Sequence, residues 1–201
     1  FFLGTDALGR CVFSRMIYGA SRTIFSSLIL VSLMFVFGSF IGIISGYIGG
    51  LFDNIVMRIV DVFLAFPSLV LAIAVAGVLG GGMINAMIAI GVIGWTKYAR
   101  LARGEVLEIK EETFIKAARL SGNSSMYIVF KHIMPRVLST LIVTASLDIG
   151  TTIMEMAALS FLGLSSPLPI PEWGAMMNEG KSMIQFAPWI TIAPGIAIFI
   201  I

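Results

Sequence analysis

Two carboxylates lie inside an apolar run, residues 137–164, that is long enough to cross a membrane. Thr144, Asp148, Thr151 and Glu155 are spaced by four, three and four residues, so a helix places all four on one face. Because a charged side chain is costly in lipid, this face should be wet. We expect it to line a path in which the carboxylates meet an amine or a cationic metal complex. The alternative is a polar seam that binds another subunit.

A third intramembrane acid, Asp61, lies three residues after Arg58. Residues three apart on a helix are neighbours, so we expect an ion pair that anchors the helix, in preference to a contact with substrate. Pro67 follows in the same apolar run and has no backbone N–H to donate, so it should bend the helix. The bend is either a static kink or a gating hinge.

The remaining residues exclude several kinds of site. His132 is the only histidine and Cys11 the only cysteine, so this chain cannot assemble a Cys/His zinc site, an internal disulfide or an intramembrane Ser/His pair. Residues 180–182 (Gly-Lys-Ser) resemble the end of a phosphate-binding loop, but Ala175 stands where that motif requires glycine. We therefore expect no catalytic residue, no metal site and no ATP site here.

The composition is that of a polytopic membrane protein, since 58% of the 201 residues are hydrophobic and only 12% are charged. The net charge of +2 is too small to indicate a nucleic-acid binder. Because about 20 apolar residues cross a bilayer, we expect an all-α transmembrane bundle with about five spans. They are predicted over residues 23–47, 55–79, 83–95, 137–164 and 187–201.

The two ends of the sequence suggest further organisation. Residues 1–22 mix charged and apolar side chains and should form an external interfacial segment, with the membrane domain over residues 23–201. The sequence starts without methionine and stops inside an apolar run, so we expect a piece of a longer chain that lacks its first span and the end of its last. Gly38, Gly42 and Gly46 either allow close helix packing or reflect the general abundance of glycine in membrane helices.

Positive charge is concentrated in one segment, because eight of the thirteen basic residues lie between residues 97 and 136. Cytoplasmic loops are rich in Lys and Arg. If this segment is cytoplasmic, alternation of the spans places nine basic residues inside and four outside. The charge therefore fixes the predicted orientation.

Helical spacing recurs within this basic segment. An amphipathic helix is predicted from the positions of Val106, Ile109, Thr113, Ala117 and Leu120. Gly122 should cap that helix, and a second short helix should start at residue 123 or 124 and end near Pro135.

Part of the basic segment resembles the EAA loop of the membrane subunits of ATP-binding-cassette (ABC) importers. Its sequence is Lys116-Ala117-Ala118-Arg119-Leu120-Ser121-Gly122, followed after nine residues by His132-Ile133-Met134-Pro135. The matching positions are Ala117, Ala118, Gly122 and Pro135, whereas Lys116, His132 and Met134 replace the family's Glu, Ile and Leu. The resemblance implies that a loop over about residues 101–136 docks on an ATPase subunit. The alternative is an ordinary amphipathic loop.

Four further blocks are similar to the second permease subunit of the dipeptide, oligopeptide and nickel transporters. They are residues 4–10 (GTDALGR), 58–67 (RIVDVFLAFP), 158–164 (ALSFLGL) and 171–176 (PEWGAM). Cys11 and residues 147–150 are closer to the nickel branch of that family. The resemblance implies a permease with the type I fold that forms the path for peptides or nickel, including metal chelates.

The same resemblance implies the partners. They are a second, homologous permease subunit, two ATP-binding subunits that hold ATP and magnesium, an external solute-binding protein and membrane lipid. The chain would be a multi-pass protein of a bacterial or archaeal inner membrane. A rival is an ion-coupled secondary transporter that uses Asp61, Asp148 and Glu155 as a relay. Such a transporter needs no ATPase, so the docking loop argues against it.

Overall fold

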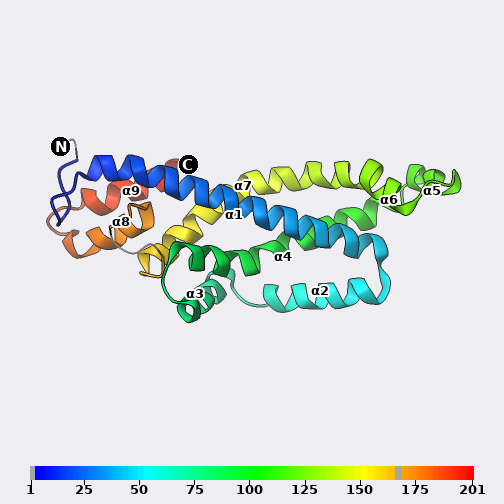
Figure 1. Cartoon of the computed structure of the whole chain (residues 1–201), viewed down its shortest axis with the longest axis horizontal. Helices are drawn as coiled ribbons and strands as arrows, with labels where there is room; N and C mark the ends of the chain where they lie inside the picture. The colour runs from blue at the N-terminus through cyan, green and yellow to red at the C-terminus, as the bar shows by residue number, and fades with distance from the viewer. Residues whose placement is uncertain (1–2, 166–168) are drawn as a thin grey trace. The chain divides into compact units, whose positions relative to one another are not determined.

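The computed structural model describes residues 3–165 and 169–201, and these are mostly helical (Figure 1). The elements are α1 (Val12–Ile48), α2 (Gly50–Leu64), α3 (Ser68–Leu79), α4 (Met83–Ile109), α5 (Thr113–Leu120), α6 (Ser125–Ile128), the π-helical turn η1 (Val129–Ile133), α7 (Met134–Phe161), α8 (Trp173–Gly180), the 3-10 turn η2 (Lys181–Met183) and α9 (Trp189–Ile200). Among the described residues the only extended pairing is an isolated bridge between Thr5 and Cys11. The all-α prediction is confirmed.

Among the described residues, two helical stretches are long and apolar enough to cross a membrane, Val12–Ile48 and Ser125–Phe161. α2 and α3 pass the same test together as a broken span, and α9 is a shorter apolar helix of 12 residues. The span expected over residues 83–95 is only the first part of α4. That helix has 27 residues because it continues without a break into the charged segment.

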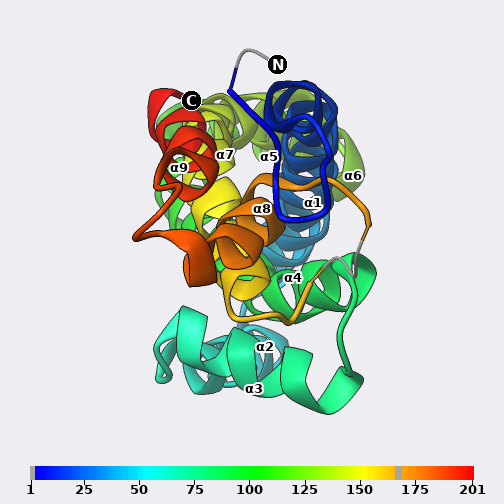
Figure 2. The ribbon, with the colours of Figure 1, turned by 90° about the vertical axis from the view of Figure 1, so that its left-hand side faces the viewer.

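The chain divides into two compact units, and α1, α4 and α7 contribute residues to both. The first unit holds residues 1–31, 69–92 and 148–201, and the second holds residues 32–68 and 93–147. In the first unit α8 and α9 lie side by side (Figure 2). Its buried apolar cluster is formed by Val12, Trp173, Met176 and Ile190.

The expected external segment, residues 1–22, is not one structural element. α1 already begins at Val12 and passes through Arg22. Arg15 lies inside this helix with a side chain that is only 9% exposed, and it forms ion pairs with Asp6 at 2.7 Å and Glu179 at 2.6 Å. The helix therefore extends further toward the N-terminus than the charges suggested, because these ion pairs compensate the buried guanidinium.

The glycines of α1 pack against α4 in the second unit. A Cβ atom added to Gly38 would lie 2.3 Å from the carbonyl oxygen of Trp95, and one added to Gly42 would lie 2.3 Å from that of Ala99. Gly46 continues the same line against Val106, with a distance of 3.0 Å to its Cβ. The three glycines therefore let two helix backbones approach closely, which decides between the two alternatives in favour of close packing.

The chain bends at Pro67, as expected, but the bend is a break between two helices and not a kink within one. α2 ends at Leu64 and α3 begins at Ser68, directly after the proline. Proline cannot donate a backbone hydrogen bond and disfavours a helical conformation at the preceding residue, so the chain starts a new helix there. Gly80 and Gly82 follow α3 with φ of +79° and +141°, conformations that suit glycine and end the helix as expected.

Candidate coupling loop and translocation face

A compact helix–turn–helix follows α4 over residues 113–128, here called the knob. At the turn Gly122 has φ of +81°, and the backbone N–H of Asn123 donates to the carbonyl oxygen of Ala118 at 3.3 Å. The hydroxyl of Ser124 then accepts from the backbone N–H of Tyr127 at 3.3 Å and caps α6. The predicted glycine cap and helix start are therefore present, and these local bonds give the knob its shape.

The knob buries one side of α5 and exposes the other. Ile115 is fully buried, whereas Leu120 is 90% exposed. Lys116 and Ala117 are also exposed, and Ala118 is half-buried. The Lys116 ammonium pairs with Glu111 at 3.2 Å, outside the helix. The motif residues therefore face away from the unit, with an apolar leucine among polar neighbours.

The amphipathic helix expected over residues 106–120 is corrected by the structure. α4 continues through Val106 to Ile109, and both side chains are buried. The chain then breaks at residues 110–112, where the Lys110 ammonium donates to the carbonyl oxygen of Gly46 at 3.1 Å. The spacing of apolar residues continues across this break, so periodicity alone predicted one helix where the structure has two.

The second short helix does not end near Pro135. α6, η1 and α7 follow one another without a gap, and Pro135 is the second residue of α7. Proline lacks the N–H that an interior helical residue donates, so the regular hydrogen-bond ladder cannot continue through it. The π-helical turn takes up this irregularity, and the helix continues to Phe161.

Aromatic and charged side chains connect the knob to the start of α7. Arg136 donates to the Glu112 carboxylate at 2.7 Å, and its guanidinium carbon lies 4.6 Å from the centroid of the Phe114 ring. His132 lies edge-on to Phe114 and Tyr127, with ring centroids 6.0 and 5.7 Å apart. Arg136 is not one of the residues predicted to have a role. Its position directly after the motif proline was the available signal.

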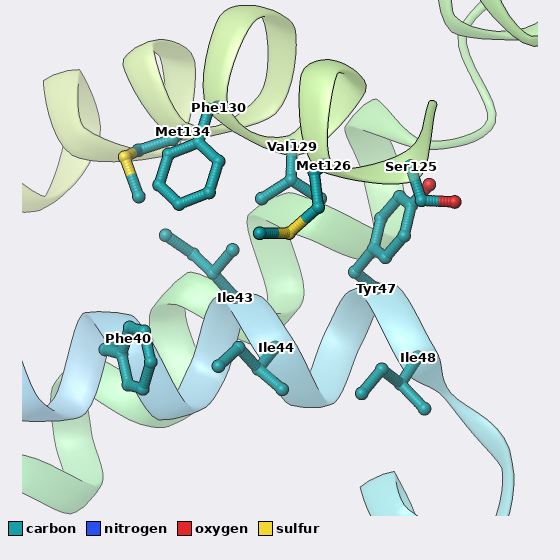
Figure 3. Close-up of a pocket in the computed structure, with 10 residues that line it drawn as sticks. All are labelled: Phe40, Ile43, Ile44, Tyr47, Ile48, Ser125, Met126, Val129, Phe130 and Met134. Atoms are coloured by element: carbon teal, nitrogen blue, oxygen red, sulfur yellow. The ribbon is translucent and has the colours of Figure 1, made fainter. Parts of the chain in front are cut away.

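An apolar groove of about 330 Å³ separates the end of α1 from the segment that joins α6 to α7 (Figure 3). It is lined by Phe40, Ile43, Ile44, Tyr47, Ile48, Ser125, Met126, Val129, Phe130 and Met134. In Figure 3 Ile43 and Tyr47 of α1 point toward the opposite wall, and Phe130 and Met126 point back toward α1. The lining groups are almost all hydrocarbon or thioether, and only Tyr47 and Ser125 carry a hydroxyl. The groove is therefore mainly apolar.

The four residues of the predicted polar face lie on α7, which is unbroken from Met134 to Phe161. Asp148 is 8% exposed, Thr144 and Glu155 are half-buried, and Thr151 is exposed. The Thr151 hydroxyl donates to the carbonyl oxygen of Asp148 at 3.1 Å within the helix. The helix and the spacing together place the four side chains along one side of α7.

Asp61 has a different partner from the one expected. Its carboxylate accepts a hydrogen bond from Arg100 of α4, and Arg58 is exposed on α2. Both members of the pair are about half exposed, with side-chain values of 50% for Arg100 and 52% for Asp61. The aspartate therefore links α2 to α4.

A buried ion pair lies in the second unit, at the start of α2. Asp53 is in the first turn of α2 and is 5% exposed. Its carboxylate accepts from the Ser45 hydroxyl at 2.6 Å and from Arg103 at 2.7 Å. These bonds join α2, α1 and α4. No motif marked this site, although an acid three residues after Gly50 was a visible signal.

Another charged cluster lies in the first unit, near the N-terminus. Arg10 pairs with Asp6 at 2.7 Å and with Glu179 at 2.6 Å. Burial raises the pKa of Asp6, but hydrogen bonds from the backbone N–H and guanidinium of Arg10 and the N–H of Leu8 outweigh it and hold the pKa below its usual value. The carboxylate therefore stays ionised at neutral pH and ties residues 6–10 to α8.

Several known proteins are similar to this chain in sequence. The model of the family described as "binding-protein-dependent transport system inner membrane component" matches residues 38–201. The dipeptide transport system permease protein DppC of Alkalihalophilus pseudofirmus is 42% identical over 200 residues, which are 100% of this chain and 66% of that protein. The glutathione transport system permease protein GsiD of Pectobacterium atrosepticum is 42% identical over 99% of this chain and 66% of its own length.

A solved structure has the same fold. The inward-facing MetNI methionine ABC transporter superposes with a TM-score of 0.70 at 20% sequence identity, over 92% of this chain and 90% of the matched chain. The chain spans 66% of the length of the two permease relatives, slightly less than two thirds.

Proposed function

The chain belongs to the family of binding-protein-dependent transport system inner membrane components, and we propose that it is a permease subunit of an ATP-driven importer of short peptides. The knob is the observation that carries this proposal. It has a fixed local shape, exposes Ala117 and Leu120, and precedes the long helix that carries Asp148 and Glu155.

The exposed face of the knob suits a protein partner. Leu120 is 90% exposed within the most highly charged segment of the chain. A large apolar side chain that is rimmed by polar groups fits a pocket on another protein. We assign that pocket to an ATPase subunit, which would bind ATP and magnesium and would move the knob as it closes.

The remaining partners follow from the family. We propose that the chain pairs with a second, homologous permease subunit, works with two ATPase subunits and receives substrate from an external solute-binding protein. It would be a multi-pass protein of the bacterial inner membrane, with residues 97–136 in the cytoplasm.

Leu120→Asp should release the ATPase from the complex. A buried carboxylate in an apolar pocket is strongly unfavourable, so we expect the amount of ATPase that co-purifies with the tagged permease to fall about tenfold or more. ATP-driven uptake into proteoliposomes should fall with it. The folded permease should persist, because Leu120 is 90% exposed in the subunit alone.

Leu8→Asp is the matched control for this variant. Leu8 is 67% exposed and lies on the predicted external side, so the same substitution there should leave ATPase binding unchanged. Retention of the ATPase by Leu120→Asp would contradict the docking role. Uptake that follows an ion gradient and survives ATP depletion would favour the secondary transporter instead.

We assign short peptides as the substrate in preference to nickel. The two relatives described above are named for dipeptide and glutathione transport. A peptide presents an ammonium group that can donate charge-assisted hydrogen bonds to a carboxylate on the path. Asp148 and Glu155 on α7 are the carboxylates proposed for this role.

Asp148→Asn and Glu155→Gln should each lower dipeptide uptake about tenfold, since a hydrogen bond to a charged group is worth about 1.5–3 kcal/mol. ATPase co-purification and the melting temperature of the complex should change little. Val143→Ala, at a 62% exposed position of the same helix, is the control and should transport normally. Unchanged uptake by both charge-removing variants would show that these acids form a subunit seam or serve another structural purpose.

A further inference from the structure

The knob is connected by the chain to two long helices, and its contacts favour one of them. Residues 110–112 lead back to α4, while α6 and η1 lead on to α7. Glu112, at the N-cap of α5, bonds to Arg136 of α7 at 2.7 Å. Phe114 of α5 lies against the same guanidinium, at 4.6 Å from ring centroid to the guanidinium carbon. Arg136 therefore holds the first turn of α5 in two ways.

Both contacts of Arg136 are made by partly exposed side chains. Its side chain is 53% exposed and that of Glu112 is 42% exposed. Exposed ion pairs and exposed cation–π contacts contribute little to folding stability. An ion pair and a cation–π contact from one guanidinium nevertheless restrict the orientation of the first turn of α5 relative to the base of α7. The cluster therefore controls the geometry of the knob more than the stability of the fold.

Arg136 also bridges an irregular part of the chain. The route from α5 to α7 passes the Gly122 turn within the knob and then the π-helical turn η1, both of which depart from regular α-helix. Local hydrogen bonds hold the Gly122 turn, so a movement of the knob can be absorbed at η1. The contacts of Arg136 bypass both, because they join Glu112 and Phe114 directly to the base of α7.

We propose that Arg136 is a positioning residue that makes the knob and the base of α7 move as one body. Movement of the ATPase is then transmitted to α7, the helix that carries Asp148 and Glu155, and is not absorbed at η1. This inference rests on the proposed function, since it requires an ATPase that moves the knob. It adds which helix receives the movement and which side chain transmits it.

The test uses the complete complex in proteoliposomes and measures peptide imported per ATP hydrolysed. Arg136→Gln removes both contacts and should lower this ratio about fivefold, which corresponds to a coupling loss at the low end of allosteric coupling energies. Glu112→Gln should lower it less, because the contact with Phe114 remains. Arg136→Lys keeps the charge near both partners and should recover most of the ratio.

The remaining measurements separate transmission from docking. ATPase co-purification, ATP hydrolysis and the melting temperature should stay at wild-type values in Arg136→Gln. Lys131→Gln removes an exposed positive charge from η1 and should leave the ratio unchanged. An unchanged ratio in Arg136→Gln would overturn the inference while leaving docking intact, and loss of bound ATPase would reassign Arg136 to docking. A wild-type permease that retains no ATPase would instead contradict the proposed function.

Discussion

Replacing Gly42 with leucine should prevent assembly of a folded permease. Even a Cβ atom at this position would lie 2.3 Å from the carbonyl oxygen of Ala99 and 2.8 Å from the Cβ of Ala102. Both atoms belong to the packed α4 helix, so no flexible side chain can move aside. The helices must separate, which costs about 3 kcal/mol or more. We expect the yield of monodisperse complex after solubilisation to fall to near background.

Gly104→Leu provides the matched comparison. Gly104 is a helical glycine of α4 with no heavy atom within 4 Å of an added Cβ, so the same side chain should fit and the yield should stay near wild type. Gly42→Ala should give an intermediate loss, because its Cβ meets the same oxygen without the larger branched group. A normal yield and melting temperature for Gly42→Leu would show that α1 and α4 do not pack through this glycine.

Asp53→Ala should destabilise the permease by about 2 kcal/mol. Removal of one partner from a buried ion pair typically costs about 3–5 kcal/mol, because the other charge is left uncompensated. Arg103 is 33% exposed and can regain some solvent, which reduces the cost. The Ser45 hydroxyl also loses its acceptor. The measurement is the melting temperature of the purified complex, which should fall by several degrees.

Asp61→Ala tests whether burial is the cause. Asp61 and Arg100 also join α2 to α4, but both side chains are about half exposed, whereas the Asp53 side chain is buried. Exposed pairs contribute about 0–1 kcal/mol, so this substitution should shift the melting temperature little. Equal shifts in melting temperature for the two variants would mean that the stability these ion pairs contribute does not depend on their burial.

Local features of the site could be predicted from the sequence. The glycine turn at Gly122 and the cap at Ser124 depend on hydrogen bonds between residues at most five positions apart. The placement of Asp148 and Glu155 on one side of α7 needs only an unbroken helix. Such features are determined by the backbone preferences and spacing of neighbouring residues, which the sequence displays directly.

Helix boundaries were less predictable, because periodicity does not reveal a break that preserves the apolar register. The predicted helix over residues 106–120 proved to be the end of α4 followed by α5. The helix expected to end near Pro135 continued, because the π-helical turn η1 accommodates the proline. In both places the outcome depended on hydrogen bonds that hydrophobic patterning does not contain.

The sequence alone determined that the chain is an all-α membrane protein, where its charged segment lies, where the Gly122 turn of the knob falls, and which residues share one side of α7. Composition, local hydrogen bonding and the helical repeat are sufficient for these conclusions. Only the tertiary structure decided the partners of the charges. Asp61 pairs with a residue 39 positions away, and Asp53 with one 50 positions away. Such pairs depend on which helices pack together, and that packing is set by close contacts such as those of Gly38 and Gly42 with α4.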